Sequence, residues 1–185
     1  VLPDNTTIGE LLDRYEEEVS PLHKSHKVEK YRLQTLRKHL GDKRVSNLLP
    51  SVVCKYRDAR LKAVSPASLK RELTILSSVL NIAGKEWGIN LQNHPVSMIS
   101  LPKIARGRER RLEAGEEEKL LSATGELKRL IILALETGMR RGEILNIKKS
   151  HIDFTRQTLL IPLTKTDTPR TIPLSSRAIE ALRGQ

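Results

Sequence analysis

The sequence predicts a mainly α-helical protein with a small antiparallel β-sheet. Across residues 1–100, apolar residues recur at intervals of three and four, which is the period of amphipathic helices. Between 151 and 174, β-branched and aromatic residues favour short strands instead. The segment 101–112 has no apolar period and is rich in Lys and Arg, so we expect a basic linker there. The chain should therefore contain two domains, residues 1–100 and 113–185.

The first domain should contain four helices, of which the first three follow from capping and periodicity. Thr7 begins the first helix, because a glutamate lies three residues later at the spacing of a capping box. The second helix covers about 24–40, with Tyr31 on its apolar side, and Gly41 follows where a C′ glycine belongs. The third covers about 50–63. We expect Tyr31 to pack in the core.

The fourth helix, residues 65–88, has the clearest pattern. Ser65 and Pro66 supply an N-cap and an N1 proline, and Gly88 supplies the stop. One face is apolar and repeats at intervals of 4, 3, 4, 3 and 4: Leu69, Leu73, Leu76, Leu80, Ala83 and Trp87. The opposite face carries short polar groups bracketed by cations: Lys70, Thr74, Ser77, Ser78, Asn81 and Lys85. Such a face suits close approach to a nucleic-acid groove, but an ordinary solvated surface explains it equally well.

The second domain should combine helices with a hairpin. Residues 113–123 favour a helix whose acidic first turn suits the helix dipole. Residues 127–135 are apolar almost all round, so that helix should be buried. A β-hairpin should follow, with the turn-like segment 164–169 between its strands and Lys165 near its tip. A last helix should begin near residue 175.

The charge of the chain points to a polyanionic partner. The formal net charge is +11, and residues 19–111 hold 20 Lys and Arg against 6 Asp and Glu. A phosphate-binding surface requires this kind of concentration. A charge that serves only solubility, or an RNA-binding role at the ribosome, also explains the net value. The aromatic content of 3% argues against the base-stacking modes of RNA recognition.

Several other classes of protein are disfavoured. Cys54 is the single cysteine, which excludes an internal disulfide and a Cys-based zinc cluster and fits a reducing cytoplasm. No apolar run approaches the ~20 residues of a membrane helix, and the first residues lack the features of a signal peptide. The sequence also lacks a P-loop and a His pair at metal-ligand spacing. We therefore expect a cytoplasmic protein without a metal or cofactor.

Three residues of the second domain are candidates for chemistry. Arg140 follows a Thr-Gly pair at the end of a helix, where its planar guanidinium suits a phosphate. Glu143 lies three residues later and suits a role in orienting that guanidinium. Spacing alone, however, favours a surface salt bridge at a helix end. Lys165 at a hairpin tip is suited to protonating a leaving oxygen or contacting a base, although most exposed hairpin lysines have no such role.

The motifs taken together resemble the tyrosine recombinases of the phage integrase family. Residues 137–145 read TGMRRGEIL, like the family's first active-site arginine motif, and HIDF follows at 151–154. TKT at 164–166 and RTIPLS at 170–175 resemble its β-hairpin lysine motif. Upstream, AGKEWG at the end of the fourth helix and NHPV beyond it resemble the end of the family's core-binding domain. The resemblance covers essentially the whole chain.

The resemblance implies a fold and a mechanism. The fold is a four-helix core-binding domain of the SAM-like type followed by part of an α/β catalytic domain. The activity is site-specific DNA recombination or integration by metal-free transesterification, in which a tyrosine forms a 3′-phosphotyrosine link. Arg140 would clamp the phosphate, Lys165 would be the general acid, and Glu143 would support the site. Full-length relatives assemble as homotetramers on double-stranded DNA.

The same resemblance implies what this chain does alone. The family's His/Lys-x-x-Arg motif and tyrosine nucleophile would lie downstream of Gln185, so we expect a C-terminally truncated chain that binds DNA without cleaving it. A non-catalytic DNA-binding regulator of the same fold is the alternative. The basic linker would lie along the DNA backbone or serve as a plain connector. The residues expected to contact DNA are Lys24, Lys27, Lys30, Lys70, Arg71, Thr74, Ser78, Asn81, Lys85, Arg106 and Arg108.

Overall fold

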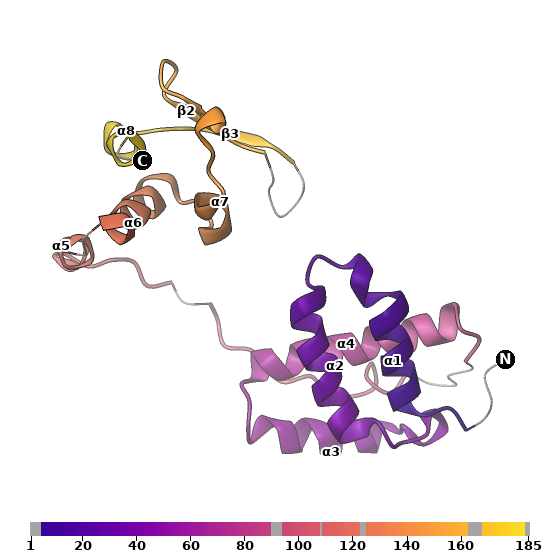
Figure 1. Ribbon diagram of the computed structural model, residues 1–185. Helices are drawn as coiled ribbons and strands as arrows, with labels where there is room; N and C mark the ends of the chain where they lie inside the picture. The colour runs from indigo at the N-terminus through magenta and orange to yellow at the C-terminus, as the bar shows by residue number, and fades with distance from the viewer. Residues whose placement is uncertain (1–4, 90–93, 108, 123–124, 163–167, 184–185) are drawn as a thin grey trace. The chain divides into compact units, whose positions relative to one another are not determined.

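The computed structural model contains mostly helices and one small antiparallel sheet, which confirms the predicted fold class (Figure 1). The chain divides into two compact units, Val1–Gly107 and Arg108–Gln185. None of the helices in the described residues is both long and apolar enough to cross a bilayer. The structure describes residues 5–89, 94–107, 109–122, 125–162 and 168–183.

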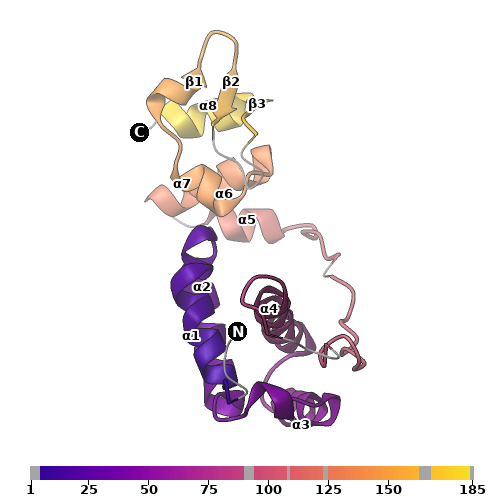
Figure 2. The same cartoon turned by 90° about the vertical axis from the view of Figure 1, so that its right-hand side faces the viewer.

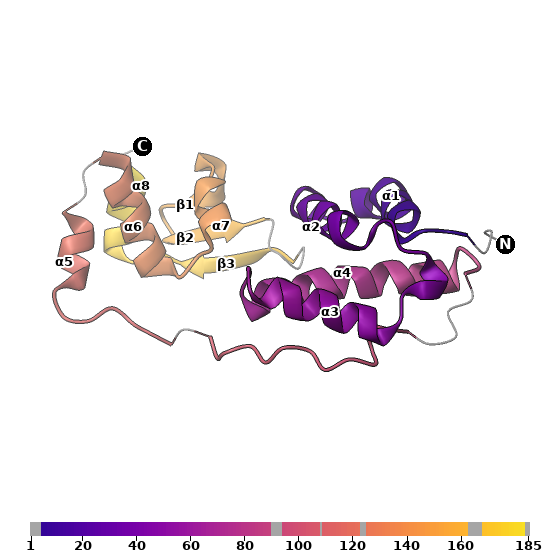
Figure 3. The same cartoon turned by 90° about the horizontal axis from the view of Figure 1, so that it is seen from below.

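The first unit is a bundle built around its longest helix. Its α-helices in the described residues are α1 (Ile8–Glu18), α2 (His26–Leu40), α3 (Pro50–Leu61) and α4 (Pro66–Lys85). Short 3₁₀ turns, η1 (Ser20–Leu22) and η2 (Val45–Asn47), connect them. Helix α4 contacts each of the other three, and Figure 3 shows it running beneath α1 and α2 and alongside α3. All six residues of the apolar stripe predicted for α4 are buried.

Local capping places the ends of these helices as the sequence predicts. The Thr7 amide donates to Glu10 Oε2 (2.7 Å), and the Glu10 amide donates to Thr7 Oγ1 (3.2 Å), which completes the capping box. Ser65 caps α4 by accepting a hydrogen bond from the Ser68 amide. Gly88 ends the α4 segment with a positive φ of 72°, a conformation that favours glycine.

Gly41 differs from its predicted role. It caps α2 in the right-handed helical region, with a φ of −57°, rather than as a left-handed C′ residue. A glycine is required there because a Cβ atom would collide with the carbonyl oxygen of Arg37. The same residue brings α1 close to α2, since the Gly9 amide donates to the Gly41 carbonyl oxygen (2.9 Å).

The predicted core position of Tyr31 is wrong. Helix α2 buries Leu33, Leu36, Leu40 and a carboxylate, Glu29, whereas Tyr31 is exposed. Glu29 is tolerated in the interior because Ser20 donates to it (2.7 Å) and the His23 ring lies 3.0 Å away. These partners offset the cost of burying a charge. The buried face of α2 therefore differs from the face that the apolar residues in the first half of this helix predict.

The second unit packs helices against a three-stranded sheet. Its antiparallel strands lie in the order β1-β2-β3, with Leu159 opposite Ile172, and α8 lies beside the sheet in Figure 2. The core joins Leu133 of α6 to Leu159 and to the apolar face of α8. The elements are α5 (Glu116–Leu121), α6 (Gly125–Thr137), α7 (Arg141–Leu145), η3 (Lys149–His151), β1 (Ile152–Asp153), β2 (Thr158–Ile161), β3 (Arg170–Pro173) and α8 (Ser176–Arg183).

Two predictions for this unit concern the β-hairpin and the apolar helix. The β-hairpin is present as β2 and β3, but its predicted tip with Lys165 lies outside the described residues. The prediction that the apolar helix is buried all round is wrong: among its described residues only Leu133 is fully buried, and Leu127 and Leu135 are exposed. Helices α5, α7 and α8 contact α6, and its buried residue belongs to the core shared with α8 and the sheet.

Candidate functional site

Arg140 stands at a chain reversal between two helices. Helix α6 ends at Thr137, and Gly138 then adopts a positive φ of 60°, which a residue with a side chain rarely adopts. The Thr137 hydroxyl accepts a hydrogen bond from the amide of Met139, which is buried beside the turn. Arg140 follows in an extended conformation as the N-cap of α7. The buried neighbour and the glycine turn therefore fix where the arginine leaves the backbone.

Glu143 connects this arginine to the sheet. Its Oε2 accepts a hydrogen bond from the Arg140 amide (3.0 Å), and its Oε1 accepts one from Arg140 Nη1 (3.2 Å). Arg170, the first residue of β3, donates from Nη1 to Oε1 (3.1 Å) and from Nη2 to Oε2 (2.8 Å). The Glu143 side chain is only 6% exposed. One buried carboxylate thus accepts bonds from two arginines on separate elements.

These bonds keep Glu143 ionised. The side-chain hydrogen bonds from Arg170, followed by the bond from the Arg140 backbone amide, lower the pKa of Glu143 from 4.5 to about 2. Hydrogen bonds to the charged form of a carboxyl favour that form. The carboxylate therefore stays negative at any physiological pH and holds both guanidinium groups in place.

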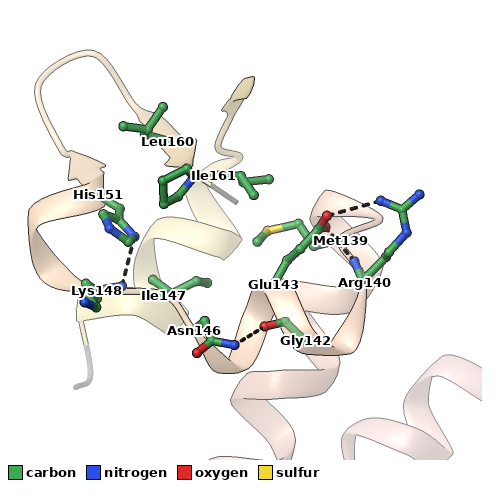
Figure 4. Close-up of a pocket in the computed structure, with 11 residues that line it drawn as sticks. Met139, Arg140, Gly142, Glu143, Asn146, Ile147, Lys148, His151, Leu160 and Ile161 are labelled. Carbon is green, nitrogen blue, oxygen red and sulfur yellow. Dashed lines mark hydrogen bonds and ion pairs between the residues drawn. The ribbon is translucent and has the colours of Figure 1, made fainter. Parts of the chain in front are cut away.

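Arg140 lines a pocket of about 520 Å³. Its side chain is 64% exposed although Nη1 bonds Glu143, so a ligand can reach the fork. Figure 4 shows Arg140, Glu143 and Met139 on one side of the pocket, with Lys148 and His151 on the other. The lining residues are Met139, Arg140, Gly142, Glu143, Asn146, Ile147, Lys148, His151, Leu160, Ile161 and Pro162. An anchored and exposed guanidinium suits an anion such as a phosphate.

Comparison with known families identifies the family to which the chain belongs. Residues 4–103 match the family model described as the phage integrase N-terminal domain, and residues 110–185 match that of the phage integrase family. The chain belongs to the phage integrase family of tyrosine recombinases. It is 34% identical to the shufflon-specific DNA recombinase of Escherichia coli over 185 residues, covering 93% of this chain and 48% of that protein. The integrase of Escherichia phage P2 is 33% identical over 132 residues, covering 71% and 38%. The chain thus spans about half the length, or less, of these relatives.

Solved integrase structures share the fold. A lambda integrase tetramer bound to a Holliday junction matches 98% of this chain and 54% of its own, with a TM-score of 0.82 and 23% identity. The Tn1549 transposon integrase in complex with circular intermediate DNA matches 97% and 64%, with a TM-score of 0.76 and 16% identity. At these identities the likeness establishes the fold alone.

The structure brings together part of the predicted integrase site and adds residues to it. Arg140 and Glu143 are in contact, as predicted, whereas Lys165 lies outside the described residues. Arg170 belongs to the RTIPLS motif, but the sequence assigns it no role because its partner is 27 residues away. His151 also belongs to a family motif, and Lys148 belongs to none. Their places beside the pocket depend on the η3 turn, which short-range patterns do not reveal.

The integrase's α4 carries most of the predicted DNA-contact residues on an accessible face. Lys70, Arg71, Thr74, Asn81 and Lys85 are exposed, and Ser78 is half-buried. Thr74 Oγ1 donates to the Lys70 carbonyl oxygen (2.8 Å), and Ser78 Oγ donates to the Thr74 carbonyl oxygen (3.0 Å). With their protons used inside the helix, these hydroxyls offer lone pairs outward. Lone pairs suit the amino groups of bases rather than phosphates.

The remaining predicted contacts lie at the other helices and in the basic segment. Lys24, Lys27 and Lys30 are exposed around the start of α2, and Lys30 Nζ lies 3.5 Å from Glu16 Oε1. Arg106 is exposed, and Arg108 lies outside the described residues. The ion pair places an acidic group next to Lys30, so a phosphate contact there would have to compete with Glu16.

Proposed function

We propose that this integrase is a site-specific DNA recombinase that breaks and rejoins DNA by metal-free transesterification through a 3′-phosphotyrosine. The observation that carries the proposal is Arg140, whose guanidinium is anchored by Glu143 yet remains largely exposed beside a pocket. Preorganised donors of this kind stabilise charge on the non-bridging oxygens of a reacting phosphate. The names of the relatives, a shufflon-specific recombinase and a phage integrase, support the same reaction class.

Each candidate residue then has a defined task. Arg140 neutralises charge on the scissile phosphate, and Glu143 holds Arg140 in place. Lys165 protonates the departing 5′-oxygen, since a lysine at this point of the motif is the family's general acid. Residues 1–100 would grip duplex DNA, residues 101–112 would act as the linker, and residues 113–185 would form the first part of the catalytic domain. In the whole protein, four copies would assemble on two DNA sites.

The tyrosines of this chain are poor candidates for the nucleophile. All three lie before residue 57, and residues 108–185 contain none. Burial raises the pKa of Tyr15 to about 12, and burial together with its bond to Glu72 raises the pKa of Tyr56. A raised pKa makes the reactive phenolate rarer. We therefore propose that the 185-residue chain alone binds duplex DNA without forming a covalent link.

A nicked suicide duplex carrying the native recombination site tests the proposal. The whole protein, translated to the stop codon of its reading frame, should form a phosphotyrosine adduct detectable by intact mass, whereas this chain should bind the duplex without an adduct. Arg140→Ala in the whole protein should lower the trapping rate by at least about 100-fold while duplex binding persists. Binding by both proteins with an adduct from neither would exclude a recombinase and favour a DNA-binding regulator of the same fold.

A further inference from the structure

Arg170 makes the most complete contact to Glu143 of any residue described. Its two terminal nitrogens each donate to a different carboxylate oxygen, at 3.1 and 2.8 Å, in the parallel fork geometry. The contact joins the first residue of β3 to α7, 27 positions away in the chain. Arg170 also supplies the first cause of the lowered pKa of Glu143.

Arg177 shows what an ordinary pair in the same unit looks like. Its Nη1 donates to Glu117 (2.6 Å) and to Glu136 (3.2 Å), so one nitrogen serves two carboxylates. Its side chain is 40% exposed, close to the 38% of Arg170. The carboxylates also differ, because the Glu143 side chain is 6% exposed and also binds Arg140, whereas the Glu117 side chain is 43% exposed. The pair of Arg170 and Glu143 is therefore connected, through Arg140, to the pocket.

We infer that Arg170 is a positioning residue of the integrase site, acting through Glu143 to hold the Arg140 guanidinium toward the scissile phosphate. This inference rests on the proposed function. Glu143 has a single rotatable carboxylate to share, and two fixed bonds from Arg170 leave it one orientation in which to receive Arg140. Outer partners of this kind orient the groups that touch the ligand.

Single-turnover cleavage of the suicide duplex by the whole protein tests the inference. Arg170→Ala should slow cleavage by about 10- to 100-fold, as loss of an orienting partner does, while the dissociation constant for duplex DNA stays unchanged. Arg170→Lys should fall between wild type and alanine, because a lysine keeps the charge but lacks the fork. Arg177→Ala, the matched control, should cleave like wild type.

Two further readouts separate positioning from a purely structural or DNA-contacting role. The losses of Arg170→Ala and Glu143→Gln should be strongly non-additive in the double variant, since both break one chain of contacts. In Arg170→Ala, the pKa of Glu143 should rise toward 4.5. The cleavage rate should then fall as the pH is lowered toward 4.5, a decrease that wild type lacks.

The outcomes are distinguishable from those of the proposed function. If wild type forms an adduct but Arg170→Ala cleaves at the same rate, the positioning role is wrong while the recombinase stands. Additive losses, or a loss confined to DNA affinity, would also overturn it, because Arg170 would then act independently of Glu143. If wild type forms no adduct, the proposed function fails and this inference fails with it.

Discussion

Each of the two units of the chain contains a carboxylate that is bound by an arginine, but the exposure of the arginine differs between them. In the first unit, Glu72 accepts bonds from Tyr56 (2.5 Å) and from two nitrogens of Arg60 (3.0 and 2.6 Å). Arg60 is 17% exposed, so its fork is spent inside the protein. In the second unit, the Glu143 side chain is also well covered, at 6% exposed, but the Arg140 side chain beside it is 64% exposed.

The difference separates stability from ligand binding. In the network of the first unit, which we call closed, the protein covers most of the arginine, and breaking the network leaves a buried carboxylate without its cation. In the network of the second unit, which we call open, Glu143 binds the Arg140 guanidinium but leaves most of the arginine exposed. Burial of the carboxylate is common to both, so the exposure of the arginine distinguishes the candidate site from the core.

The largest expected effect comes from breaking the closed network. Arg60→Ala leaves the buried Glu72 without its cation and with only the Tyr56 hydroxyl as a partner, so the first unit should lose about 3–5 kcal/mol of its free energy of unfolding. Trp87 is the single tryptophan, and it is buried in this unit, so its fluorescence in a denaturant titration reports the loss.

The same helix offers a matched control for this prediction. Arg57 pairs with the exposed Asp58 at 2.8 Å and donates to the Ser100 carbonyl oxygen (2.9 Å). Neither partner is a buried charge, so Arg57→Ala should shift the Trp87 transition much less. Equal shifts for the two variants would mean that burial of the carboxylate does not set the size of the effect. The distinction between closed and open networks would then be lost.

A second prediction concerns acid and the open network. The pKa of Glu143 in the folded protein, about 2, is below its ordinary value of 4.5. Its contribution to stability is therefore fully present above pH 4.5 and is lost as pH falls through about 2. Carboxyl carbon NMR should place the Glu143 midpoint near 2 in wild type and nearer 4.5 in Arg170→Ala. A wild-type midpoint near 4.5 would show that Arg170 does not hold the carboxylate in solution.

The sequence predicts the parts of this molecule that depend on neighbours along the chain. The α4 stripe is entirely buried, and the Thr7 capping box forms with the expected partner. Arg140 and Glu143 meet because they lie three positions apart at the start of a helix, where an N-cap and its N3 residue face each other. Periodicity and capping are short-range properties, so sequence alone reveals them.

The failures at Tyr31, Arg170 and Leu127 depend on contacts between segments that are apart in the chain. Tyr31 is exposed because α2 buries Glu29 instead. That burial requires Ser20 to donate to the Glu29 carboxylate and His23 to lie beside it. The contact of Arg170 with Glu143 spans 27 residues, so no local pattern indicates it. Leu127 is exposed although its helix is rich in apolar residues, because composition does not show which faces neighbouring elements cover.

The smallest expected effect sharpens the comparison within the first unit. Lys70 is exposed on α4, two residues before the buried Glu72 that binds Arg60. Lys70→Ala should leave the Trp87 unfolding transition unchanged, because no buried charge loses its partner. If Lys70 contacts a phosphate, the slope of log affinity against log salt should fall by about 0.9. Fluorescence anisotropy with a labelled duplex at several salt concentrations measures that slope.

Lys55→Ala provides the reference, since Lys55 is an exposed lysine of α3 outside the predicted DNA-contact set. Its slope should equal that of wild type. A slope that changes equally in both variants would indicate a diffuse charge effect, and an unchanged slope for Lys70→Ala would remove Lys70 from the interface. Only a change in slope confined to Lys70→Ala supports the view that exposed cations of the first unit contact DNA, whereas Arg60 stabilises the core.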